Sequence, residues 1–177
     1  MKRVGKTRRL CVDAALICAA FALSYAEHMI PLMPSVLPGV KPGLANIVTT
    51  VTFFALSPID AAAISLCRVL LAGMIFGGPV SLAVSFGGAA ASYLGLCAVC
   101  FMPKIKEHLS FVGISGFCAA LHSAGQLCTV AVISGTGAFT YLPVMLAASC
   151  ITGAINGFIL NLTYPSFSGI LGRYGIK

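Results

Sequence analysis

The residue with the clearest chemical meaning in this sequence is Arg68, which lies within the otherwise apolar stretch from Ala61 to Phe76. An arginine at the centre of a membrane helix costs roughly 2.5–3.5 kcal/mol to insert, and its guanidinium stays protonated. It therefore requires an acid, helix-end carbonyls, water or an anionic ligand as its partner. A buried pair that fixes the fold and a contact to a ligand both fit this position.

His122 and Gln126 are the next candidates, because a spacing of four residues places both side chains on one helical face. A neutral imidazole both donates and accepts hydrogen bonds, and it protonates near neutral pH. An interhelical hydrogen bond is the structural alternative for this pair. The predicted ligand-binding set is Lys41, Asn46, Arg68, His122 and Gln126, with Glu27, His28, Thr49 and Asn156 as further possible members.

Signatures of bond-making chemistry are missing from the sequence. There is no Gly-rich phosphate loop followed by Lys-Ser/Thr, and only two aspartates are present, too few for the Asp-rich Mg²⁺ motifs of prenyl-diphosphate chemistry. Cys97 and Cys100 have the spacing of a redox or metal pair, but the eight cysteines all lie within or beside apolar segments and are interpreted as small packing residues. We therefore predict a binding or conducting role, with no enzyme activity, metal site or disulfide.

The composition places these residues inside a membrane. Charged residues make up 8% of the chain and hydrophobic residues 59%, whereas a soluble domain carries roughly 25% charged residues. A helix that crosses the hydrocarbon needs about 20 apolar residues. We predict an all-α, polytopic membrane protein with a single domain over residues 1–177: a basic tail (1–9), a bundle of about six transmembrane helices (10–165) and a second tail (166–177).

Six apolar segments can be recognised along the chain. A Pro/Gly-rich connection over 31–43 precludes a regular helix, and the second segment is short for a full crossing. Ser57 before Pro58 and Asp60 predicts a capped helix start. The predicted spans cover residues 10–30, 44–56, 57–76, 80–102, 111–134 and 139–164.

The basic residues predict the orientation of the bundle. Five of the eleven lie within the first nine residues, and Lys104, Lys106, Arg173 and Lys177 share their side if there are six spans. The opposite side then carries only Lys41. By the positive-inside rule both termini are cytoplasmic, so we predict a multi-pass protein of the cell membrane. A basic run beside an apolar span contacts anionic lipid, and no nucleic-acid partner is predicted.

Small residues recur at four-residue spacing, which lets helix backbones approach closely in lipid. For Gly73/Gly77, Ala120/Ala124 and Gly153/Gly157 we predict packing inside the bundle. The first span carries two such pairs in series, so it is the candidate docking face for a partner protein. These residues are Ala15, Ala19, Ala22 and Ala26.

Several short motifs in order resemble the Gx transporter family, whose members are also labelled heptaprenyl diphosphate synthase component I. The motifs are Lys41-Pro-Gly-Leu-Ala-Asn46, Arg68-Val-Leu-Leu-Ala-Gly73, Ser85-Phe-Gly-Gly88, His122-x-x-Gly-Gln126 and Tyr141-Leu-Pro143. That family is similar in architecture to the S components of energy-coupling-factor transporters. The resemblance implies six helices, a small molecule bound near the outer face beneath the first long loop, and docking to a transmembrane coupling subunit with ATPases.

The predicted function is an S-component-like membrane subunit that binds a small polar or anionic molecule for uptake. Arg68 would offset the charge of the ligand, His122 and Gln126 would orient it, and the loop with Lys41 would gate access. Two alternatives stay open. One is a membrane subunit of an electron-transfer system, with flavin or quinone supplied through redox partners. The other is a membrane partner of prenyl diphosphate synthesis.

Overall fold

The regular structure of the protein is helical throughout the described part of the chain. The computed structural model describes residues 2–29, 43–101 and 109–173, and the side chains from residue 6 onward. Lys41 and the loop 104–108 lie outside these residues. The elements are α1 (Lys2–Met29), α2 (Asn46–Ala55), α3 (Pro58–Ala72), the π-helix η1 (Gly73–Gly77), α4 (Gly78–Phe101), α6 (Phe111–Ser134), the 3-10 helix η2 (Thr136–Tyr141) and α7 (Leu142–Arg173).

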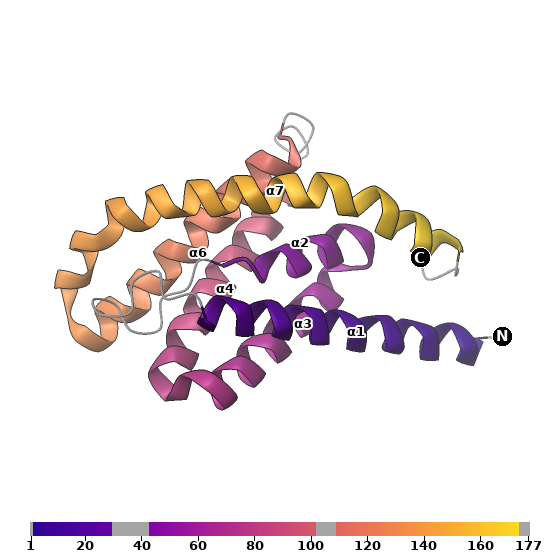
Figure 1. Ribbon diagram of the computed structural model, residues 1–177, viewed down its shortest axis with the longest axis horizontal. Helices are drawn as coiled ribbons and strands as arrows, with labels where there is room; N and C mark the ends of the chain where they lie inside the picture. Colours follow the sequence, from indigo (N-terminus) through magenta and orange to yellow (C-terminus); the bar gives the residue numbers. More distant parts are fainter. Residues whose placement is uncertain (1, 30–42, 102–108, 174–177) are drawn as a thin grey trace.

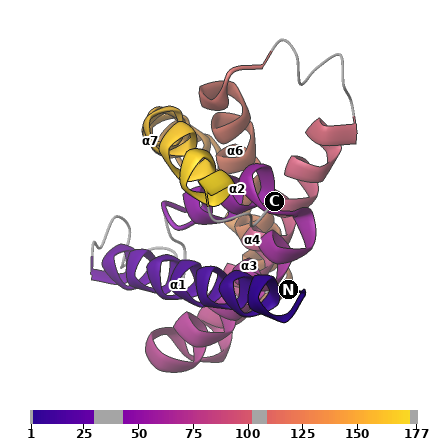
Figure 2. The same ribbon diagram turned by 90° about the vertical axis from the view of Figure 1, so that its right-hand side faces the viewer.

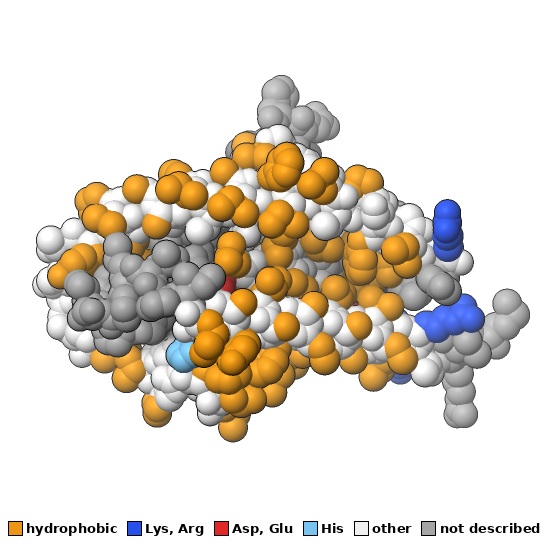
Figure 3. Space-filling view, in the orientation of Figure 1, with side chains coloured by type: hydrophobic (Ala, Val, Ile, Leu, Met, Phe, Trp, Pro, Cys, Tyr) orange, Lys and Arg blue, Asp and Glu red, His pale blue; other side chains and the backbone are white. Residues whose placement is uncertain are grey.

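The surface of this helical assembly is that of a membrane protein. Among the described residues, four segments are long and apolar enough to cross a membrane, namely Lys6–Met29, Pro58–Phe101, Phe111–Ser134 and Thr136–Arg173. Large apolar side chains such as Phe101 and Val132 are 86% exposed. Figure 3 shows hydrophobic side chains over the whole length of one face, while the Lys and Arg side chains gather at the end where both chain termini lie. Such a surface is stable only against lipid.

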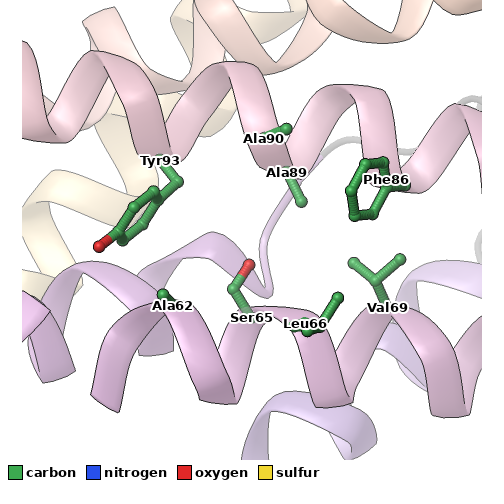
Figure 4. Close-up of a pocket in the computed structure, with 8 residues that line it drawn as sticks. All are labelled: Ala62, Ser65, Leu66, Val69, Phe86, Ala89, Ala90 and Tyr93. Atoms are coloured by element: carbon green, nitrogen blue, oxygen red, sulfur yellow. The ribbon is translucent and has the colours of Figure 1, made fainter. Parts of the chain in front are cut away.

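The 44-residue segment from Pro58 to Phe101 contains a chain reversal. The π-helix η1 widens the end of α3, and Gly78 then adopts φ +67°, a left-handed conformation that favours glycine. Across the gap Ala62 faces Tyr93 and Val69 faces Phe86, so α3 and α4 are antiparallel (Figure 4). A shallow apolar groove of about 100 Å³ lies between them. The turn predicted at residues 77–79 is confirmed at Gly78.

The start of α3 is fixed by a capping interaction. Ser57 is the N-cap residue, and its hydroxyl accepts the backbone N–H of Asp60 at 3.2 Å. Arg9 of α1 forms an ion pair with Asp60 and donates to Ser57 at 3.2 Å. The cap predicted from the sequence is therefore confirmed. The half-exposed ion pair ties the N-terminal third of α1 to the first turn of α3, although such pairs contribute only about 0–1 kcal/mol.

Helices α4, α6 and α7 pack through glycines. A Cβ atom on Gly125 would lie 2.5 Å from the carbonyl oxygen of Gly87, where α6 crosses α4. A Cβ on Gly153 would lie 2.6 Å from Cα of Gly116, and one on Gly157 would lie 2.4 Å from Cα of Val112, where α7 crosses α6. The backbones are thus in contact, and the internal packing role predicted for Gly153 and Gly157 is confirmed.

Two helix ends differ from the predicted boundaries. Helix α1 begins at Lys2 rather than Leu10, and α7 runs through Pro165 to Arg173 rather than ending at Tyr164. A proline inside a helix removes one backbone hydrogen bond. The last turns of α7 are held by packing instead, because Leu171 is buried in a cluster with Ala55. Residues 166–173 are therefore helical.

The short helix α2 lies in the core of the bundle, between the two longest helices. Helices α1 and α7 lie on opposite sides with the short α2 between them (Figures 1 and 2). Helix α2 contacts α1, α3, α6 and α7, and eight of its ten residues are buried. At 1.5 Å per residue it is about 15 Å long, too short to cross a bilayer of about 30 Å. Helix α2 therefore begins inside the bundle, where Ala45 and Asn46 are buried.

Candidate ligand-binding site

Arg68 lies in the interior of the bundle, as predicted. Its side chain projects from α3 and the residue is 5% exposed. One terminal nitrogen donates to the hydroxyl of Ser24 on α1 at 3.4 Å, and the other donates to Oδ1 of Asn46 on α2 at 3.3 Å. Both partners are neutral and both distances are long for a hydrogen bond. The Nε–H group is buried with no hydrogen-bond partner.

The N-terminus of α2 is built around Gly43. This residue has φ +83°, and a Cβ there would lie 3.1 Å from the ring of His122, so both the turn and the available space require glycine. Its carbonyl oxygen accepts the backbone N–H of Asn46 at 3.1 Å and Nδ2 of Asn156 at 3.2 Å. The carboxylate of Glu27 accepts the backbone N–H of Ala45 at 2.9 Å.

This arrangement makes the start of α2 electrostatically positive. A helix N-terminus carries about half a positive charge. Arg68 lies beside this N-terminus, since it donates a hydrogen bond to the side chain of Asn46. Glu27 supplies a negative charge from α1. Short helices that begin inside a membrane protein are a common device for binding the anionic group of a substrate at membrane depth.

Helix α6 adds a second pair of polar side chains. Nε2 of Gln126 lies 3.1 Å from Nε2 of His122, and the two residues are 0% and 3% exposed. Gly88 on α4 lets them approach, because a Cβ there would lie 2.7 Å from Gln126 and 2.8 Å from His122. The shared helical face predicted for this pair is confirmed.

Two small cavities of about 10 Å³ each adjoin these groups. A cavity of that volume holds about one water molecule. Asn46 borders one cavity directly and is bonded to Arg68 of the other, so both lie at the start of α2. The first is lined by Ser24, Glu27, Arg68, Val69, Ala72, Ser85, His122 and Gln126, and the second by Asn46, Ile47, Thr50, Ser115, Cys118, Ala119 and Asn156.

Six buried polar atoms in this region have no hydrogen-bond partner in the described part of the chain. At about 1–3 kcal/mol each, leaving all six unpaired would cost roughly 6–18 kcal/mol, as much as the net stability of a typical domain. Such groups require water or a ligand. They are Nδ2 of Asn46, Oγ1 of Thr49, Nε of Arg68, Oγ of Ser85, Oε1 of Gln126 and Oδ1 of Asn156.

Comparison with protein-family models gives a match to heptaprenyl diphosphate synthase component I over residues 16–163. The match covers most of the chain. The chain belongs to this family. The resemblance inferred from the short motifs is thereby confirmed, and the matched range takes in every described residue of the two cavities. Comparison with curated proteins and with solved structures gives no match.

The structure places most of the predicted site residues of this family member in one region. His28 is a surface residue that stacks on Phe76 with ring centroids 5.8 Å apart, so it does not join them. Lys41 lies outside the described residues. Those brought together at the start of α2 are Glu27, Asn46, Thr49, Arg68, His122, Gln126 and Asn156, all of them buried.

Three contributors were missed by the sequence reasoning. Ser24 lies three residues before Glu27, on the same face of α1. Ser85 and Gly88 belong to a motif that carried the family resemblance, but only the geometry shows that they border His122 and Gln126. A serine inside an apolar helix is too common to signal a site alone.

The remaining candidates lie away from the cavities. The face of α1 formed by Ala15, Ala19, Ala22 and Ala26 is exposed, while Ala20, Ser24 and Glu27 on the other face are buried. All eight cysteines, including Cys97 and Cys100, are free thiols. Within residues 2–29, 43–101 and 109–173, no three His, Cys, Asp or Glu side chains are arranged to hold a metal ion.

Proposed function

We propose that this protein is a membrane subunit that binds a small polar or anionic molecule for uptake. The observation that carries the proposal is the cluster of six unpaired polar atoms around Arg68 and the start of α2. Inside a membrane each such atom must be satisfied within the protein or by a bound molecule. A ligand that replaces water in the two cavities would satisfy the five atoms whose residues line them, which are all of the six except Oγ1 of Thr49.

Each side chain has a distinct role in this proposal. Arg68 contacts the most electronegative group of the ligand through Nε, because its two other nitrogens are engaged by Ser24 and Asn46. Gln126 and Asn156 accept from ligand donors through their unpaired oxygens. The cavities hold about one water each, so the bundle opens at the start of α2 to admit a larger molecule.

The proposed topology has six membrane segments, formed by α1, α2, α3 with η1, α4, α6 and α7. The short α2 is a half-span. An even number agrees with the start of α1 and the end of α7 lying at the same end of the molecule (Figure 1). Basic residues, including Lys6, Arg8 and Arg173, belong to these ends, so by the positive-inside rule we expect both ends to lie in the cytoplasm of a cell-membrane protein.

Epitope tags placed before residue 1 and after residue 177 test this topology. We expect neither tag to bind antibody in intact spheroplasts and both to bind after the membrane is permeabilised. A cytoplasmic protein and a tagged outer-surface protein serve as controls. Labelling of either tag in intact spheroplasts would contradict six segments with cytoplasmic ends.

Two kinds of protein partner are compatible with the proposal. The exposed small-residue face of α1 would dock a transmembrane coupling subunit that works with ATPases. The family description, component I of a synthase, favours a second candidate function as the membrane partner of a prenyl diphosphate synthase. An electron-transfer role would instead need redox proteins with flavin or quinone.

Mass spectrometry of the tagged protein, gently extracted from its own membrane, separates these functions. We expect a retained small molecule, and a coupling subunit or its ATPases among the associated proteins. Recovery of a prenyl synthase with no small molecule would favour the second function and contradict the uptake proposal. Recovery of flavin or quinone with redox proteins would favour electron transfer and would also contradict the uptake proposal.

A further inference from the structure

The orientations of two buried asparagine amides are fixed by their partners. Arg68 can only donate, so the atom of Asn46 that it contacts must be the oxygen, and the unpaired atom is the NH₂ group. The carbonyl of Gly43 can only accept, so Asn156 presents its NH₂ group there and its oxygen is unpaired. Exchange of nitrogen and oxygen in either amide would place like groups together.

The cavity between α2, α6 and α7 therefore has a defined hydrogen-bonding character. Asn46 and Asn156 both line it, so its walls offer one unpaired donor and one unpaired acceptor. The cavity between α1, α3, α4 and α6 has the same character when Nε2 of His122 carries no proton. Gln126 then donates to that nitrogen through Nε2 at 3.1 Å, which leaves its Oε1 as an unpaired acceptor beside the unpaired donor Nε of Arg68. A molecule that fills these cavities must accept and donate in each of them.

The charges that line the cavity between α1, α3, α4 and α6 also balance. Among its described lining residues, Arg68 carries one positive charge and Glu27 one negative charge. A phosphate ester brings several negative charges and, when ionised, only acceptor oxygens. It would turn lone pairs toward Gln126 and Asn156 and would repel Glu27. Each buried acceptor left without a donor costs about 1–3 kcal/mol.

We propose that the bound molecule is net-neutral and carries N–H or O–H donors beside its acceptors, as an amide, a ureido ring or a zwitterionic amino acid does. Phosphate and diphosphate esters are excluded by the same pattern. This inference rests on the proposed ligand-binding function and narrows the class of its ligand. The carboxylate or carbonyl of the ligand contacts Arg68, and its donor groups contact Gln126 and Asn156.

The variant Gln126→Glu tests the inference, because it places a stronger acceptor and a negative charge where the ligand is expected to donate. We expect Gln126→Glu, which keeps an acceptor, to lose less of the co-purifying molecule than Gln126→Leu, which removes the acceptor and lowers retention by about tenfold or more. Asn161→Asp, the same chemical change at an exposed site on α7, is the control. Thermal unfolding in detergent verifies that each variant is folded.

A second measurement uses the wild-type protein alone. Inorganic diphosphate and farnesyl diphosphate at millimolar concentration are expected neither to displace the retained molecule nor to raise the unfolding midpoint. Loss of retention in Gln126→Glu as large as in Gln126→Leu, or displacement by either diphosphate, would overturn the inference. A retained molecule that contains phosphorus would overturn it and leave the binding function intact. A wild-type protein that retains nothing contradicts the binding function itself.

Discussion

Replacing Arg68 by glutamine lowers the retention of the bound molecule by about 100-fold. Hydrogen bonds to a charged group contribute about 1.5–3 kcal/mol, which corresponds to roughly 10- to 150-fold in affinity. Arg68 is the only arginine or lysine among the buried residues of the described chain, so no neighbouring side chain can substitute for it. Quantitative mass spectrometry of the co-purified molecule, normalised to protein, measures the effect.

Two further variants, one conservative and one at an exposed site, serve as controls. Arg68→Lys keeps the charge but replaces a fork of donors with a single ammonium, so we expect an intermediate loss of about tenfold. Arg173→Gln, at an exposed position at the end of α7, should retain the molecule at the wild-type level. If folded Arg68→Gln protein retained the ligand fully, Arg68 would serve only to hold α1, α2 and α3 together.

Replacing Gly153 or Gly157 by valine strongly destabilises the bundle. A Cβ at either position would lie within 2.6 Å of backbone atoms of α6, which cannot move as a side chain does. Overpacking typically costs about 1–3 kcal/mol and more against backbone. For a chain of this size each kcal/mol shifts the unfolding midpoint by about 2–4 °C, so we expect a fall of roughly 10 °C in a thermal aggregation assay.

The matched control lies on the same helix. Gly169 has no atom within 4 Å of where a Cβ would be, so Gly169→Val should change the midpoint by about 2 °C or less. Equal effects of valine at Gly157 and Gly169 would show that loss of glycine itself, and not contact between α6 and α7, governs stability. Gly157→Val should also lower ligand retention, because Asn156 of the ligand site adjoins Gly157 on α7.

The membrane character and the helical fold follow from features that the sequence displays directly. Low charge and long apolar segments leave few alternatives, and the cap at Ser57 depends on neighbours three residues apart. Helices α1 and α7 extend beyond the predicted spans 10–30 and 139–164, because neither the basic tail nor Pro165 ends a helix. Packing of Leu171 against Ala55, which are far apart in the chain, decides the end of α7.

The site was predictable where a residue is costly in lipid. Arg68, His122, Gln126 and Glu27 are rare inside apolar segments, so each is conspicuous. Ser24 and Ser85 are not costly there, and their role depends on which helices meet. His28 adjoins Glu27 in sequence but lies on the exposed face of α1, a difference that depends on the rotation of the helix.

The central claim is that the polar cluster at the start of α2 binds one small molecule per chain. The most direct test is equilibrium dialysis of the co-purified molecule, in labelled form, against the wild-type protein and Arg68→Gln in detergent. We predict saturable binding with one site per chain in the wild type and about 100-fold weaker binding in the variant. Uptake that rises linearly with concentration, equal in both proteins and in empty micelles, would show partition into detergent and contradict the claim.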